Sequence, residues 1–146
     1  MIRPKPSSFA KTKTRSVPKP IQDASGIVRV AAVQMASGPN VAANLAEAER
    51  LIDMAVASGA KLVALPEFFA IMGLKETDKV SVAEVDGKGP IQKFLAAQAK
   101  KHAIWLVGGS VPLACDNPKK VRKACLVYDD KGKRVATRVD HLAAEH

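Results

Sequence analysis

Hydrophobic and polar positions first define a strand, a helix and a second strand. Val28–Met35 is a β-branched run that a Ser-Gly-Pro loop ends, and Asn40 is a suitable N-cap for a helix that Gly59 would end. The next apolar run, Leu62–Leu65, predicts a buried strand. This unit is as long as a βαβ crossover, so the two strands should be parallel. The helix between them has one apolar stripe, made of Val41, Leu45, Ala48, Ile52 and Ala55.

The second half of the chain predicts one more helix and three more strands. Pro90 opens a helix that runs to about His102, and Ala103–Val107 reads as the third strand. Ala124–Tyr128 is the fourth strand, and a turn at residues 129–132 leads into Lys133–Val139. The order predicts an α/β fold, with helices on one face of the sheet and no residues left to cover the other. The inner face of the helix is expected to hold Ile91, Phe94, Leu95 and Gln98, and the polar connections are residues 70–88 and 114–121.

Composition separates the chain into a basic extension and one domain. Of 146 residues 47% are hydrophobic, which is globular. No apolar run approaches the roughly 20 residues that cross a bilayer, and no secretory segment follows Met1, so a cytoplasmic protein without membrane contact is expected. The net charge is +9, yet residues 1–27 hold six basic side chains against Asp23 alone. We therefore expect an extension over 1–27 and a domain over 28–146.

The extension has three open interpretations. It holds four of the nine prolines, together with serine, threonine and lysine, and such a segment buries too little apolar surface to become ordered. Its charge suits a basic arm that binds nucleic acid. Its poverty in acidic residues also suits an organelle-targeting peptide, although the prolines oppose an amphipathic helix. The third interpretation is a solvated leader with no role.

Glu67 is the candidate catalytic residue. It follows Pro66, which ends the second strand because proline has no N–H to donate. Apolar neighbours on both sides should disfavour its charged form and raise its pKa, as a general base requires. In open α/β sheets, sites gather just beyond the C-terminal ends of the strands, where Glu67 lies. The alternative is a solvated glutamate in a loop.

Other reactive residues favour structural interpretations. Cys115 and Cys125 match neither a disulfide framework nor a zinc pattern, so two reduced thiols are expected. His102 reads as a helix-end residue that faces a carbonyl or solvent rather than as a base. Gly108-Gly109-Ser110 lacks the lysine of a phosphate loop, and its glycines would admit either a substrate or another backbone. No cofactor or metal is predicted.

The order of several motifs resembles the N-terminal half of the carbon–nitrogen hydrolase family, the nitrilase superfamily. Within it the resemblance is greatest to bacterial amidases of the omega-amidase and deaminated-glutathione amidase type. It covers about residues 28–142. It rests on Val30–Met35, Asn44-Leu45, Leu65–Phe69, Gly89-Pro90, Gly108–Ser110 and Ala124–Asp129.

The resemblance implies half of an α-β-β-α sandwich, an oligomer, and hydrolysis of small amides or nitriles by a Cys-Glu-Lys triad. Glutamate takes the thiol proton, the thiolate attacks carbon, ammonia leaves, and lysine stabilises the developing charge. Glu67 matches the glutamate of the family. The lysine position falls on Val139 or on Asp140, depending on the alignment, and Lys123 stands where the family has asparagine. Lys131 and Lys133 are near in sequence but lie in a turn.

Three hypotheses follow. In the first, the chain is a truncated amidase that lacks the nucleophile and is inactive alone, because the match decays after Ala136. In the second, it is a non-catalytic half-domain that associates through its exposed sheet, with itself or with a complementing C-terminal half. In the third, its basic tail binds nucleic acid, which is the weakest of the three. The substrate-binding residues and the substrate itself stay unknown.

Overall fold

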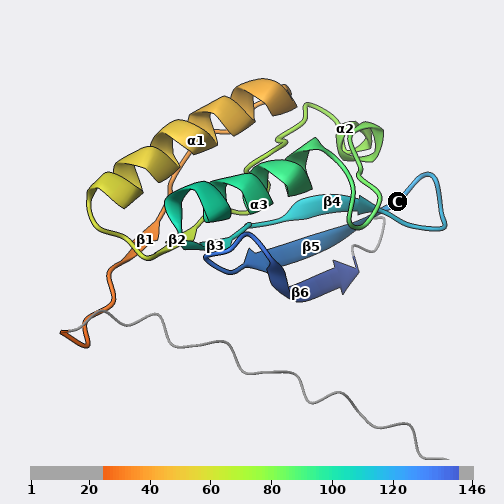
Figure 1. Ribbon diagram of the computed structural model, residues 1–146. Coiled ribbons are helices and arrows are strands. Elements are labelled where there is room, and N and C mark those ends of the chain that lie inside the picture. The colour runs from red at the N-terminus through yellow and green to blue at the C-terminus, as the bar shows by residue number, and fades with distance from the viewer. Residues whose placement is uncertain (1–24, 142–146) are drawn as a thin grey trace, which may run out of the picture.

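Six strands and three helices make up the part of the chain that the computed structural model describes, residues 25–141 (Figure 1). The basic extension therefore lies almost wholly outside the described residues. In chain order the elements are β1 (Val30–Ala32), α1 (Val41–Ala57), β2 (Leu62–Ala64), α2 (Thr77–Ser81), α3 (Pro90–His102), β3 (Trp105–Val107), β4 (Val111–Ala114), β5 (Val121–Tyr128) and β6 (Arg134–His141).

The strands form one mixed sheet, as predicted. β1, β2 and β3 are parallel neighbours, and β5 runs antiparallel to β3, β4 and β6. β3 pairs with one end of β5, through Leu106 and Tyr128, whereas β4 pairs with the other end, through Val111 and Ala124. Residues 108–110 therefore interrupt what is otherwise one line of pairing along β5.

Helix α1 forms as its sequence predicts. The side chain of Asn40 accepts a hydrogen bond from the backbone N–H of Ala43 at 2.9 Å, which satisfies one of the free donors at the helix start. Ala48 and Ile52 are fully buried against the sheet. After the C-cap residue Ser58, Gly59 adopts a left-handed φ of 90° and ends the helix.

Helix α3 begins at Pro90, and a buried carboxylate binds its N-terminus. Glu84 is 5% exposed, and its Oε2 and Oε1 accept the backbone N–H groups of Ile91 at 2.6 Å and Gln92 at 3.0 Å. A side chain on Gly89, whose φ is 126°, would collide with this carboxylate. Of the predicted inner face, Ile91, Leu95 and Gln98 are buried, whereas Phe94 is half-buried.

The connection predicted at residues 70–88 contains a helix, β4 was not predicted, and the first strand is shorter than expected. Residues 70–88 contain the five-residue helix α2, whose length is too short to show a period in sequence. β4 precedes the loop predicted at 114–121, and proline within it hides the strand pattern. The expected first strand, Val28–Met35, pairs only over Val30–Ala32.

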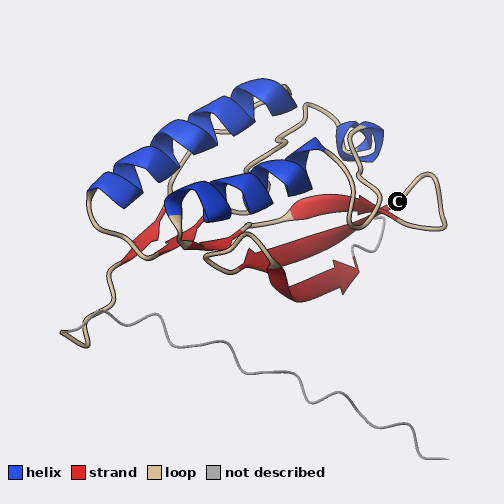
Figure 2. Ribbon diagram, in the orientation of Figure 1, coloured by secondary structure: helices blue, strands red, loops and turns tan. Residues whose placement is uncertain are grey.

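All helices lie on one side of the sheet (Figure 2). The residues that face them, such as Val63, Leu106 and Leu126, are fully buried. Strand alternation turns the intervening residues to the opposite side, which no other described element covers. We call this side the open face. Its apolar members are Val30, Ala32, Leu62, Ala64, Trp105, Val107 and Val127. Within residues 25–141, none of the helices is long and apolar enough to cross a membrane.

Candidate active site

Glu67 lies just past the C-terminal end of a parallel strand, as predicted. β2 ends at Ala64, and Leu65 continues the pairing through its N–H, which donates to the carbonyl oxygen of Val107 at 2.9 Å. Pro66 then stops the ladder. The expected apolar surroundings of Glu67 are wrong, because 58% of its side chain is exposed. The neighbouring apolar side chain of Phe69 turns into the core, where it is fully buried, and leaves the carboxylate outside.

Residues 108–110, which connect β3 to β4, hold the turn that contains Glu67 in place. Phe68 has a left-handed φ of 54°, which is unfavourable for a bulky side chain. Its backbone N–H donates to the Oγ of Ser110 at 2.7 Å. Gly109 has a φ of 56°, and a Cβ there would collide with the carbonyl oxygen of Pro66. The close approach that the glycines permit is therefore that of another backbone, and it makes the turn rigid.

Lys123 reaches the carboxylate from β5. Its Nζ donates to the Oε1 of Glu67 in an ion pair, and only 22% of the lysine side chain is exposed. The hydrogen bond to Glu67 raises the pKa of Lys123, against a smaller effect of burial. The expectation that Glu67 has no lysine partner is corrected by this contact. The sequence placed Lys123 just ahead of the fourth predicted strand, whereas β5 begins at Val121 and includes it, and only the pairing of β5 brings the two residues together.

A second ammonium lies at the same turn. The Nζ of Lys79, on α2, is 4.0 Å from the centre of the Phe68 ring, and that of Lys123 is 5.7 Å from it. Both distances allow a cation–π interaction. Lys79 is 13% exposed and also lies 3.3 Å from Glu76. Because α2 was not predicted, the sequence offered no signal for this contact. Two positively charged lysine side chains therefore lie beside the turn that contains Glu67.

The register of β6 shows how the two candidate lysine positions, Val139 and Asp140, are oriented. Val139 pairs with Ala124 and packs against the core, so it points away from Glu67. Asp140 lies opposite Lys123 and shares its side of the sheet. Its charge also helps to raise the pKa of Lys123.

Lys131 and Lys133 lie at the far end of the same hairpin. The turn contains Asp129, whose Oδ1 accepts both of their backbone N–H groups, at 3.0 and 2.9 Å. Six residues of extended strand separate Asp129 from Lys123, which is about 20 Å. The two turn lysines are therefore remote from Glu67, as predicted.

Neither cysteine is in the state that a nucleophile needs. Cys125 lies two residues from Lys123 on the same side of β5, and burial raises the pKa of its thiol. Its thiol is therefore protonated near neutral pH. The Sγ of Cys115 donates to the backbone carbonyls of Asn117, at 3.4 Å, and Lys120, at 3.3 Å. Both are free thiols, as predicted.

His102 belongs to the helix layer rather than to the Glu67 turn. Its Nε2 lies 2.9 Å from the Oδ1 of Asp53 on α1. It faces a carboxylate, and not the carbonyl or solvent that the sequence predicted. Among the described residues, no cluster of three or more histidine, cysteine, aspartate or glutamate side chains could hold a metal ion.

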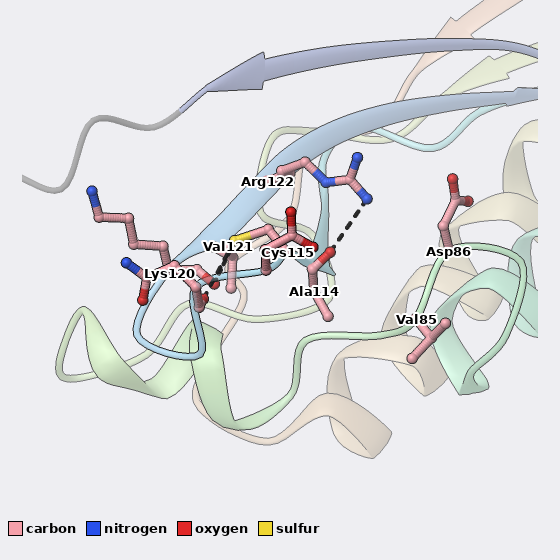
Figure 3. Close-up of a pocket in the computed structure, with 9 residues that line it drawn as sticks. Val85, Asp86, Ala114, Cys115, Lys120, Val121 and Arg122 are labelled. Atoms are coloured by element: carbon pink, nitrogen blue, oxygen red, sulfur yellow. Dashed lines mark hydrogen bonds between the residues drawn. The ribbon is translucent and has the colours of Figure 1, made fainter.

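A cavity of about 680 Å³ opens beside the loop between β4 and β5 (Figure 3). Arg122 faces it, and its guanidinium donates to the carbonyl oxygen of Ala114 at 3.3 Å. Neither Glu67 nor Lys123 lines this cavity. The remaining lining residues are Val85, Asp86, Cys115, Asp116, Asn117, Lys120 and Val121. The cavity is thus separate from the candidate site.

Known proteins identify the fold and its family. A family model for carbon-nitrogen hydrolases matches residues 29–143. The chain belongs to the carbon–nitrogen hydrolase family. The match places both Glu67 and Lys123 within the hydrolase domain, and it confirms the resemblance to the nitrilase superfamily and its omega-amidases.

Two curated relatives show how much of a hydrolase the chain spans. Deaminated glutathione amidase of Synechocystis is 45% identical over 82 residues, which is 56% of this chain and 29% of the relative. Nitrilase homolog 2 of Dictyostelium discoideum is 35% identical over 114 residues, which is 77% of this chain and 34% of the relative. The chain therefore spans about a third of the length of these hydrolases.

Solved structures agree with the fold. The NitFhit protein of C. elegans superimposes with a TM-score of 0.69 at 25% identity, over 80% of this chain and 29% of that one. Nit3 of Saccharomyces cerevisiae, a member of branch 10 of the nitrilase superfamily, gives 0.63 at 30% identity, over 70% and 40%. The mixed sheet with its helices is thus the fold of this hydrolase family.

Proposed function

We propose that this chain provides the general base, Glu67, for hydrolysis of a small carboxylic amide. The observation that carries the proposal is the position of Glu67. It stands on a rigid turn at the end of β2, with a solvent-accessible carboxylate, in a chain of the carbon–nitrogen hydrolase family. Several relatives are named as omega-amidases or deaminated glutathione amidases. These names favour a short acid that carries a terminal amide over a nitrile.

The reaction proceeds through a thioester. Glu67 accepts the proton of a cysteine thiol, and the thiolate attacks the amide carbon. The C–N bond then breaks as the leaving nitrogen takes that proton from Glu67 and departs as ammonia. Water then hydrolyses the thioester and releases the acid and the thiol. Cys115 and Cys125 do not suit the nucleophile, so we assign it to polypeptide outside residues 25–141.

The partner that we propose is a C-terminal hydrolase half that packs on the open face. An uncovered apolar sheet face is unstable in water, and a second layer would bury it. That layer would also bring a cysteine close to Glu67, since the carboxylate is exposed just past the C-terminal end of β2. Without it, the described residues lack the attacking group.

Ammonia release from a short omega-amide tests the proposal. The full chain is assayed alone and after mixing with the C-terminal part of the Synechocystis amidase. We expect activity only in the mixture, and a loss of at least about 100-fold in Glu67→Gln, as for removal of a general base. The control is Glu76→Gln, at the residue just before α2, whose side chain is 92% exposed and which should keep full activity. Equal activity of Glu67→Gln and the unmodified chain would refute the role of Glu67.

A further inference from the structure

The partner of Glu67 comes from an unexpected strand. Ala124 and Leu126 of β5 are fully buried beneath the helices, so alternation places Lys123 on the open face. From there its Nζ contacts the carboxylate of Glu67. Only 22% of the lysine side chain is exposed although it carries a charge. Its aliphatic stem therefore packs against the protein, and its ammonium group points toward Glu67.

The position across the hairpin carries the opposite charge. Asp140 of β6 lies opposite Lys123. Side chains that face each other across antiparallel strands have Cβ atoms about 4.5–5.5 Å apart. A flexible lysine on either strand could therefore reach the same carboxylate. The Nε of Arg138 lies 3.4 Å from the Oδ1 of Asp140, which gives the aspartate a second cationic neighbour. The two strands thus present one lysine and one acid at a single register position.

We propose that Lys123 is the positioning ammonium for Glu67, and that the β5 and β6 positions at this register are interchangeable for that role. This inference rests on the proposed function, and it departs from the resemblance, which implies a lysine on β6. Here the lysine lies on β5, at the position where the resemblance implies asparagine, and Asp140 lies opposite it on β6. During the reaction, the Lys123 ammonium would orient the Glu67 side chain and donate to the oxygen that becomes negative as the amide carbon is attacked.

The surroundings of Lys123 support a directed contact. The groups that face it are Glu67 from the β2 turn, Asp140 from β6 and the ring of Phe68. Lys79 does not replace it, because the described ion pair of Lys79 is with Glu76, the N-cap residue of α2. Lys131 and Lys133 are about 20 Å away along the hairpin. Lys123 is therefore the lysine that the described fold directs to this carboxylate.

Titration of lysine amines by NMR, in the full chain labelled with nitrogen-15 lysine, tests the contact. We expect Glu67→Gln to lower the pKa of the Lys123 amine, because it removes the hydrogen bond that raises it. Glu76→Gln, which removes the partner of Lys79, should leave the Lys123 titration unchanged. A Lys123 titration that is the same in Glu67→Gln would overturn the inference.

An exchange variant tests interchangeability. Lys123→Asn combined with Asp140→Lys moves the amine to β6, and its pKa should again fall when Glu67→Gln is added. An amine at position 140 that titrates independently of Glu67 would overturn the inference. Circular dichroism verifies folding, and Lys123→Met provides a second removal variant if Lys123→Asn does not fold.

The active mixture separates this inference from the proposed function. Lys123→Asn should lower kcat at least about 100-fold with little change in KM, as for loss of one charge-stabilising donor. The exchange variant should recover most of that loss, and Lys131→Asn should have no effect. Full activity of Lys123→Asn would overturn the inference while the proposed function stands. If the unmodified chain is inactive in the mixture, the proposed function fails, and the NMR titrations still decide the contact.

Discussion

At the scale of single residues, the site depends on a strained turn that distant residues hold in place. Phe68 accepts a left-handed backbone conformation, which costs roughly 1–2 kcal/mol for a residue with a side chain. Ser110 and Gly109, more than 40 positions along the chain, stabilise it by a hydrogen bond and by close backbone contact. Strain at such a position is typical of functional sites.

Gly109→Ala should destabilise the protein by more than about 2 kcal/mol. The change adds the cost of a left-handed alanine to a collision with the carbonyl oxygen of Pro66. Urea denaturation measures the loss. Gly38→Ala is the matched control, because a Cβ at Gly38 would contact nothing within 4 Å. Equal stability of the two variants would contradict the proposed origin of the rigid turn.

At the scale of elements, the start of α3 depends on a carboxylate that lies outside the helix. Glu84 accepts the backbone N–H groups of Ile91 and Gln92, and the Nε2 of Gln92 donates to it at 3.1 Å. A buried negative charge at a helix N-terminus also interacts favourably with the helix dipole. Glu84 thus ties the connection after α2 to the helix that covers the sheet.

Glu84→Ala should therefore lower the free energy of unfolding by about 2–4 kcal/mol, because it leaves buried donors without an acceptor. Glu84→Gln should cost less, since an amide oxygen still accepts. Thermal or urea unfolding measures both. Glu76→Ala, which removes an exposed glutamate next to α2, should change stability by less than about 0.5 kcal/mol. A Glu84→Ala variant as stable as this control would refute the capping role.

Strand β5 should make the fold sensitive to alkali. It carries three groups with raised pKa: Lys123 through its hydrogen bond to Glu67, and Cys125 and Tyr128 through burial. A raised pKa means that the folded state keeps its proton longer than the unfolded state, so the stabilisation is present at neutral pH and is lost as pH rises. The ordinary values of 9.0, 10.0 and 10.5 set the beginning of that loss near pH 9.

Tyr128→Phe tests the alkaline effect, because it removes the titrating hydroxyl and keeps the ring. Between about pH 8 and about pH 10.5, urea midpoints of the unmodified chain should fall more than those of Tyr128→Phe. Cys125→Ala should reduce the fall separately. Identical pH dependence in all three proteins would show that these groups do not control alkaline stability.

At the scale of the whole molecule, the fold is one-sided. The helices bury one face of the sheet (Figure 2). The open face presents apolar side chains on four neighbouring strands, β1, β2, β3 and β5. Val30, on the edge strand β1, is 62% exposed. The chain spans about a third of the length of the curated relatives it matches.

The full chain should self-associate through the open face when no C-terminal half is present. Val30→Lys should shift the distribution toward the monomer in sedimentation velocity. Val85→Lys is the matched control, because Val85 is 61% exposed but follows Glu84, which bridges to β4 at the opposite end of the strand order from β1. A monomeric unmodified chain, or equal effects of the two variants, would contradict association through this face.

The sequence by itself determined the local elements and the family. The apolar stripe, Asn40 and Gly59 predicted α1, Pro90 predicted α3, and the run before Pro66 predicted the strand that carries Glu67, because periods and caps act between near neighbours. Tertiary structure alone decided the exposure of Glu67, its contact with Lys123 and the position of Asp140 opposite Lys123. These depend on which strands pair and in which register, and a shift of one residue would turn every side chain of β5 or β6 to the other face.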